Sequence, residues 1–139
     1  MMDGATLAYS PFVLLLAWSV VLLVVHIMLQ GQLATRELGT KWNAGPRDGD
    51  LKPKGALAGR AARASANFRE TYPAFVALAA AAGLMGIASG WALIGAYVWF
   101  VCRIVYIPLY LAGVPYVRSL VWLGSLVGLL AMFIAIVFA

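Results

Sequence analysis

Polar side chains recur at helical spacing inside sequence that is otherwise apolar. Arg63, Asn67 and Glu70 stand at i, i+4 and i+7, so on an α-helix they share one narrow face. An ionisable residue in a lipid-facing helix costs about 2.5–3.5 kcal/mol at the helix centre, and such residues therefore usually face a bundle interior or a cavity. This face is the first candidate for a binding site.

A second polar face follows farther along the chain. Arg103, Tyr106 and Tyr110 stand at i, i+3 and i+7 in an apolar run, and Arg118 comes soon after a turn that contains Gly and Pro. Like the first face, it places a charged side chain within an apolar segment that is otherwise suited to a lipid environment. It is the second candidate.

The charges on the two faces do not balance. Three arginines, Arg63, Arg103 and Arg118, stand against one carboxylate, Glu70, which gives a net charge of +2. A buried anion is the partner that this charge predicts, and a ligand with carboxylates or a thiolate would fit. The alternative is purely structural: Glu70 would be a buried ion-pair partner of Arg103 or Arg63, with no ligand at all.

The composition indicates the fold class that positions these two polar faces. Of the 139 residues, 64% are hydrophobic and 11% are charged, against about 25% charged in a typical soluble domain. The chain is therefore predicted to be an all-α integral membrane protein. Its basic residues do not form a solvated patch with interleaved aromatics, which argues against nucleic-acid binding. One His, one Cys and one intramembrane Glu do not make a metal site, and Cys102 is predicted to pack in the core.

Four membrane-spanning helices are predicted in a single domain that covers residues 1–139. Ser10 and Pro11 supply the N-cap and first-turn signals of the first helix, and its apolar run is too long for a signal peptide. A polar loop rich in Gly and Pro follows it over residues 33–55. The predicted helices cover about 11–32, 56–88, 91–111 and 116–138.

The distribution of basic residues predicts the topology. The loop 33–55 is rich in Lys and Arg, whereas the opposite flanks of the predicted helices carry none, so the loop should be cytoplasmic and both termini outside. Both polar faces then fall in the cytoplasmic leaflet and predict one cavity that opens there. His26 and Gln30 fall at the same depth, although a neutral histidine at the membrane interface is the simpler interpretation of His26.

These residues resemble the MAPEG family, the membrane-associated proteins of eicosanoid and glutathione metabolism. The resemblance covers nearly the whole chain and is carried by RAARASANFRETYPAF, residues 60–75, and RIVYIPLYLAGVPYVRS, residues 103–119. The loop segment WNAGPRDGD, residues 42–50, is similar to the short bacterial branch of the family, which implies a bacterial inner membrane.

The resemblance implies a four-helix bundle that assembles as a homotrimer, with glutathione as the co-substrate bound between neighbouring subunits. Arg118 would match the thiol-activating arginine of the family. The first helix lacks an arginine that some members place near its inner end, and His26, Gln30 or Arg36 would substitute for it. The residues that would hold glutathione, carried over by position, are Arg63, Asn67, Glu70, Arg103 and Tyr106.

Thiol activation is the chemistry that the resemblance implies. A thiol with a reference pKa of about 8.5 is mostly protonated at neutral pH, and an arginine in surroundings of low dielectric stabilises the thiolate. Arg118 is the predicted activating residue, and the hydroxyl of Tyr110, or alternatively of Tyr106, is predicted to donate to the sulfur or to charge that develops on the electrophile. The predicted function is a membrane glutathione transferase or peroxidase for lipophilic electrophiles that arrive from the lipid.

Two other functions stay open at the level of sequence. The first is a trimeric membrane protein that binds a lipid or a glutathione-like anion without catalysis, and thiolate formation would separate it from a transferase. The second is a small drug/proton exporter, which needs an embedded carboxylate as its proton carrier. Such exporters usually carry that carboxylate in the first helix, where this chain has none.

Overall fold

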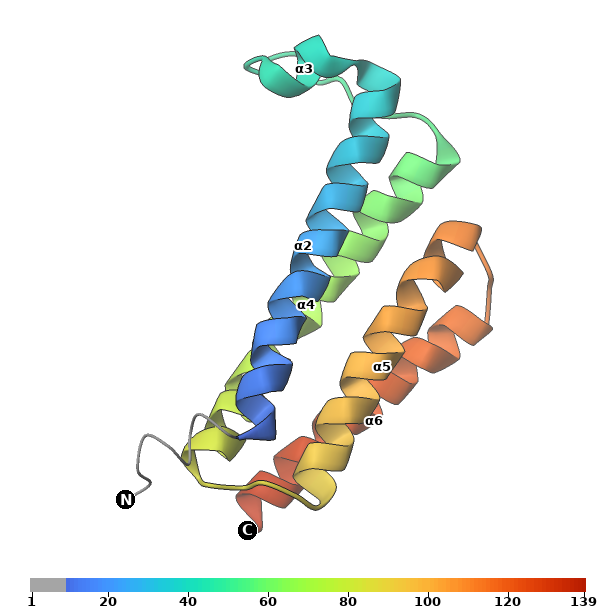
Figure 1. Cartoon of the computed structure of the whole chain (residues 1–139). Coiled ribbons are helices and arrows are strands. Elements are labelled where there is room, and N and C mark those ends of the chain that lie inside the picture. Colours follow the sequence, from blue (N-terminus) through green and yellow to red (C-terminus); the bar gives the residue numbers. More distant parts are fainter. Residues whose placement is uncertain (1–9) are drawn as a thin grey trace.

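The computed structural model describes residues 10–139, and every regular element in that range is a helix. Four long helices run side by side, and one short helix crosses one end of them (Figure 1). The first nine residues, which include the N-terminus predicted to lie outside, are not among those described. The elements are α2 (Pro11–Leu38), α3 (Thr40–Ala44), α4 (Ala56–Leu84), α5 (Trp91–Ala112) and α6 (Val117–Val137).

The first helix is longer than its apolar stretch. The sequence predicted an end near residue 32, but α2 continues to Leu38 and stops at Gly39, whose φ is 89°. The added residues include Ala, Arg, Glu and Leu, which are good helix formers, so the loss of hydrophobicity marks the end of the membrane-spanning part and not the end of the helix. The predicted loop 33–55 therefore begins as helix and also contains α3.

The second long helix is shorter than predicted. α4 ends at Leu84 rather than near residue 88, because the chain turns through Gly86 with a φ of 74°. Among the described helices, α2, α5 and α6 are long and apolar enough to cross a membrane, which agrees with an integral membrane protein. α4 carries the charged residues in its first half, and its assignment as a fourth span stays a prediction.

The helices pack as two antiparallel pairs. α2 lies along α4, α5 lies along α6, and α4 joins the pairs through contacts with α5 and α6 (Figure 1). The end of α2, the start of α4, the end of α5 and the start of α6 all lie at the end of the bundle that carries α3. We call this end the loop end.

Aromatic packing and a close glycine crossing hold the pairs together. The rings of Phe75 and Trp99 stack with centroids 3.9 Å apart, and both side chains are fully buried. One turn before Trp99 on α5, a Cβ added to Gly95 would lie 2.5 Å from the carbonyl oxygen of Gly128 on α6. Only glycine therefore allows α5 and α6 to approach this closely.

A carboxylate ties the two ends of the loop together. Glu37, in the last turn of α2, accepts hydrogen bonds from the backbone N–H groups of Lys54 and Gly55 at 2.8–3.1 Å. Gly55 is the N-cap residue of α4, so the negative charge also lies at the favourable end of that helix. This contact holds the start of α4 beside the end of α2.

Candidate functional site

The two polar faces predicted from the sequence meet between α4 and α5. Arg103 of α5 is fully buried, and its Nη1 and Nη2 atoms both donate to Oδ1 of Asn67 on α4, each at 3.0 Å. The guanidinium carbon also lies 4.6 Å from the centroid of the Tyr106 ring and 5.4 Å from that of Phe68. A buried cation thus has an amide and two aromatic faces as its partners.

This arrangement overturns the idea that Glu70 neutralises Arg103. The hydrogen-bond partner of Arg103 is the neutral Asn67, while Glu70 is exposed on α4. Glu70 stands three residues beyond Asn67, about 60° around α4, and this offset leaves its side chain exposed while Asn67 meets α5. Among the described residues, no carboxylate forms a hydrogen bond with the Arg103 guanidinium.

The contacts continue from α5 to α6. The rings of Tyr106 and Tyr110 have centroids 5.3 Å apart, and the guanidinium carbon of Arg118 lies 4.6 Å from the centroid of Tyr110. Tyr110 and Arg118 are half-buried. Two arginines and two tyrosines from two helices thus form one continuous series at the loop end, with both phenol groups between the cations. We call Arg103, Tyr106, Tyr110 and Arg118 the cation–tyrosine series.

Arg63 and Glu70 lie on the open surface of α4. Both side chains are exposed, and a Cβ added to Gly59 would lie 3.2 Å from Nη1 of Arg63, so this arginine extends back along its own helix. The structure therefore brings Asn67, Arg103, Tyr106, Tyr110 and Arg118 together and leaves the other two predicted residues of α4 facing outward.

His26 is buried inside the helix bundle. It is 2% exposed, and its ring stacks on Phe68 with centroids 4.6 Å apart. Its depth at the level of the membrane interface stays a prediction, and the rotation of α2 directs its side chain toward Phe68 of α4. Among the described residues, its Nε2 atom has no hydrogen-bond partner. Phe68 thus contacts both His26 and Arg103.

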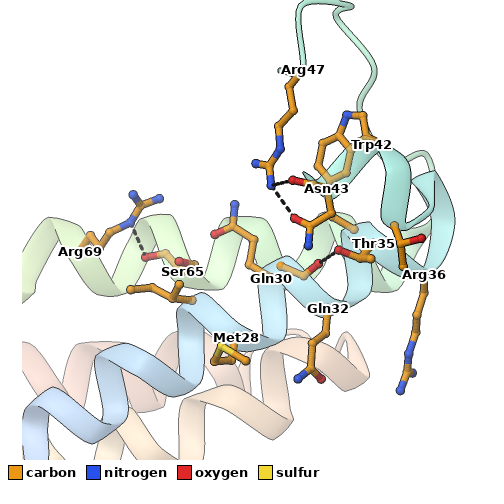
Figure 2. A pocket seen from close by; sticks show the side chains of 14 residues that line it. Met28, Gln30, Gln32, Thr35, Arg36, Trp42, Asn43, Arg47, Ser65 and Arg69 are labelled. Atoms are coloured by element: carbon orange, nitrogen blue, oxygen red, sulfur yellow. Dashed lines mark hydrogen bonds between the residues drawn. The ribbon is translucent and has the colours of Figure 1, made fainter. Parts of the chain in front are cut away.

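A separate groove lies on another flank of α4. Its volume is about 980 Å³, and it runs between the last turns of α2, the short helix α3 and the middle of α4. Gln30 and Arg36, the other two residues proposed as substitutes in the first helix, both line it. Figure 2 shows Gln30 on the side of α2 where Asn43 and Arg47 lie, and Arg36 pointing to the other side.

Several residues of this groove were not among the predicted site residues. Ser65 and Arg69 line it from α4, and Trp42 and Arg47 line it from α3 and the loop. Helical spacing puts Arg69 about 160° around the helix from Asn67, and this was the available signal. Trp42 and Arg47 could not be placed, because a turn-rich loop has no periodicity from which an orientation can be read.

The groove and the cation–tyrosine series use different faces of α4. At about 100° per residue, Ser65 and Arg69 lie roughly 160–200° around the helix from Asn67. One chain therefore carries two polar surfaces that point in different directions. The cation–tyrosine series presents two guanidinium groups and two phenol groups, and the groove presents polar side chains of α2, α3 and α4.

Comparison with known proteins agrees with the resemblance seen in the sequence. A family model described as the MAPEG family matches residues 15–138, nearly the whole chain. No curated protein and no solved structure matches the chain. The matched range contains both polar faces, the loop and the cation–tyrosine series. The chain belongs to the MAPEG family.

Proposed function

We propose that this protein binds glutathione at the loop end and activates its thiol toward lipophilic electrophiles. Membership of the MAPEG family supports a role related to glutathione or eicosanoid metabolism in a membrane. The observation that carries the proposal is the cation–tyrosine series, in which Arg103 has an amide in place of a carboxylate as its hydrogen-bond partner. Such a site favours an anion with several charged oxygens and a thiolate.

Asn67 and Arg103 act as a pair in this proposal. Because the Oδ1 atom of Asn67 accepts both hydrogen bonds from Arg103, the Nδ2 group of the amide is left to donate elsewhere. Arg103 therefore positions Asn67 as a donor toward a carboxylate of glutathione. Tyr106 packs against the same guanidinium, and Arg63 and Glu70 would reach the charged ends of the peptide from the outside.

Arg118 and Tyr110 would carry the chemistry. Arg118 balances the charge of the glutathione thiolate, and the Tyr110 hydroxyl donates a hydrogen bond to the sulfur or to the electrophile. In a conjugation, the sulfur forms a bond to carbon with its own electron pair, and the leaving group departs with the pair of the bond that breaks. The contact between the Arg118 guanidinium and the Tyr110 ring keeps the two side chains close enough to act on the same sulfur atom.

We also propose that neighbouring copies share each site. The part of the groove nearest α4, lined by Gln30, Ser65 and Arg69, faces away from the cation–tyrosine series. A ring of copies, such as the homotrimer implied by the family, would bring this surface of one copy against the series of the next. His26 would support the site indirectly, because its ring packs on the Phe68 ring, which in turn contacts the Arg103 guanidinium.

The charge distribution favours a cytoplasmic loop end. Arg36, Lys41, Arg47, Lys52 and Lys54 all lie in or beside the loop that crosses this end, as the positive-inside rule expects of a cytoplasmic segment. In a bacterial inner membrane, the proposed site would then face the compartment that holds glutathione.

Calorimetry with glutathione on the detergent-purified protein tests this proposal, together with the ultraviolet absorbance of the thiolate. We expect the wild type to bind at millimolar glutathione or below and to show the thiolate band. Arg118→Ala should keep binding and lose most of the band, because the other ligand contacts remain. Lys52→Ala, which removes an exposed loop cation, is the matched control and should behave as the wild type.

The two other outcomes of this experiment point to different functions. Binding without a thiolate band would favour the non-catalytic alternative, a membrane protein that holds glutathione or a similar anion. An absence of binding at millimolar glutathione would overturn the glutathione assignment.

A further inference from the structure

We propose that Arg60 is a positioning residue, which fixes the turn between α5 and α6 and thereby sets Arg118 against Tyr110. Such a role rests on the proposed activation of the glutathione thiol. Arg60 is the first residue of the segment 60–75 that carries the family resemblance, yet it is not among the residues predicted to touch glutathione. One hydrogen bond and one close contact connect it to the turn.

Arg60 lies on the face of α4 that meets α5. It stands seven residues before Asn67, so the two side chains differ by only about 20° around the helix and by roughly 10 Å along it. Asn67 accepts from Arg103 at one level, and Nη1 of Arg60 donates to the carbonyl oxygen of Leu111 at 3.2 Å at the other. The residues of α4 that line the groove under α3 are about 140–180° away, so a copy that covers the groove leaves this contact in place.

The hydrogen bond lies at the C-terminal end of α5. Leu111 belongs to the last turn of that helix, where carbonyl groups lack partners within the helix and carry partial negative charge. A guanidinium is a favourable partner there, and Arg60 is half-buried as it reaches across from α4. Among the described residues, this carbonyl is the one hydrogen-bond acceptor of the Arg60 side chain.

The guanidinium of Arg60 also covers Gly113, the C-cap residue of α5. A Cβ added to this glycine would lie 2.6 Å from both the Cζ atom and the Nη2 atom of Arg60. Gly113 has a φ of 72°, the left-handed conformation in which helices often end. The glycine thus permits the positive φ and leaves room for the guanidinium to lie against the backbone.

The turn that begins at Gly113 is short and has an unusual backbone. Tyr116, which lies between Gly113 and Arg118, has a φ of 57°, a value uncommon for a residue with a side chain. Tyr116 is 82% exposed, so its side chain is not packed into the bundle. Such a conformation persists only where the surroundings hold it, and Arg60 supplies a hydrogen bond and a close contact at the start of the turn.

The shape of this turn matters because the two proposed reacting groups lie on either side of it. Tyr110 is in the last turn of α5 and Arg118 is the second residue of α6, and the Arg118 guanidinium carbon lies 4.6 Å from the centroid of the Tyr110 ring. Without Arg60, the start of α6 can shift against the end of α5, and the charge of Arg118 moves away from the sulfur. Arg60 therefore acts on the thiol through Arg118.

The pH dependence of the thiolate band of bound glutathione tests this role. We expect Arg60→Met to raise the midpoint of the band by about one pH unit, because an opposite charge at about 4–6 Å moves a pKa by about one to three pH units and part of that effect is lost. Arg60→Lys keeps a cation that can donate to the Leu111 carbonyl, and it should restore much of the wild-type midpoint. Lys52→Met, which removes an exposed loop cation, is the matched control and should leave the midpoint unchanged.

A second variant separates the contact of Arg60 from its charge. Gly113→Ala keeps the arginine but puts a methyl group where the guanidinium lies, and it should also raise the midpoint. The double variant with Arg60→Met should raise the midpoint no further than the larger single change, because both changes remove the same contact. Additive changes of the midpoint would mean that Arg60 acts through its charge alone, and would overturn the proposal.

Binding of S-methylglutathione, which has no thiol to ionise, separates positioning from direct contact with the ligand. Arg60→Met should bind it with unchanged affinity, and a weaker affinity would make Arg60 a ligand contact and overturn the proposal. An unchanged midpoint in Arg60→Met would overturn it as well, because a lower unfolding temperature alone would show a purely structural role. A wild type without a thiolate band would instead overturn the proposed function, and the role of Arg60 with it.

Discussion

At the scale of single residues, the central feature is a buried arginine whose partner is an amide. Arg103 is fully buried and bonds to Asn67 through two nitrogens. Hydrogen bonds to a charged group contribute more than neutral ones, about 1.5–3 kcal/mol each. An amide satisfies the geometry of the guanidinium without cancelling its charge, so the pair is stable and still attracts an anion.

Asn67→Leu should destabilise the protein by about 3 kcal/mol, because it leaves a buried charge without its partner. Asn67→Asp should instead preserve stability, since it forms an ion pair, but should weaken glutathione binding by about tenfold through loss of the site's charge. Thermal unfolding in detergent and calorimetry measure the two effects. Ala77→Leu, at an exposed position of α4, is the control for added bulk. A stable Asn67→Leu protein would contradict this account of Arg103.

At the scale of elements, the loop-end site depends on how closely α5 and α6 approach. Gly95 and Gly128 meet backbone to backbone, with an added Cβ on either within 2.6 Å of the other's carbonyl oxygen. The crossing sets the position of Arg118 on α6 relative to Tyr110 on α5. A backbone atom cannot move aside as a side chain can, so this contact tolerates no methyl group.

Gly95→Ala should therefore cost about 1–3 kcal/mol, as overpacking does, and should separate the two helices. Gly31→Ala is the matched control, because it lies within α2 with nothing inside 4 Å of an added Cβ. That variant should be neutral or more stable by about 0.5–1 kcal/mol, the helix penalty of glycine. Thermal unfolding of both proteins measures the difference. Equal stabilities would show that the crossing can relax.

At the scale of the whole molecule, one chain presents two polar surfaces that do not face each other. The cation–tyrosine series lies between α4, α5 and α6, and the groove lies between α2, α3 and α4. The proposed site shared between copies would use both surfaces and would require residues of two chains at once.

Mixing two inactive variants tests such sharing. Arg118→Ala disables the series, and the double variant Gln30→Leu with Arg69→Leu disables the α4 side of the groove. Co-expressed in equal amounts, they should regain about one quarter of the wild-type activity, because that share of the interfaces pairs two intact surfaces. Each variant expressed alone is the control. Failure of the mixture to exceed the separate variants would mean that every chain holds a complete site.

The sequence alone determined the features that depend on local pattern. Hydropathy and helical spacing indicated an all-helical membrane protein and the polar faces around Asn67 and Arg103, and two motifs indicated the MAPEG family. These features are readable because side-chain direction repeats with the turn of the helix.

Only the tertiary structure decided which side chains meet. It gave Arg103 an amide partner in place of Glu70, buried His26 against Phe68, and extended α2 to Leu38. It also placed Arg47 beside Trp42 under α3. Each of these results depends on the rotation of one helix against another or on the path of an aperiodic loop, and both are set by packing between segments far apart in the chain.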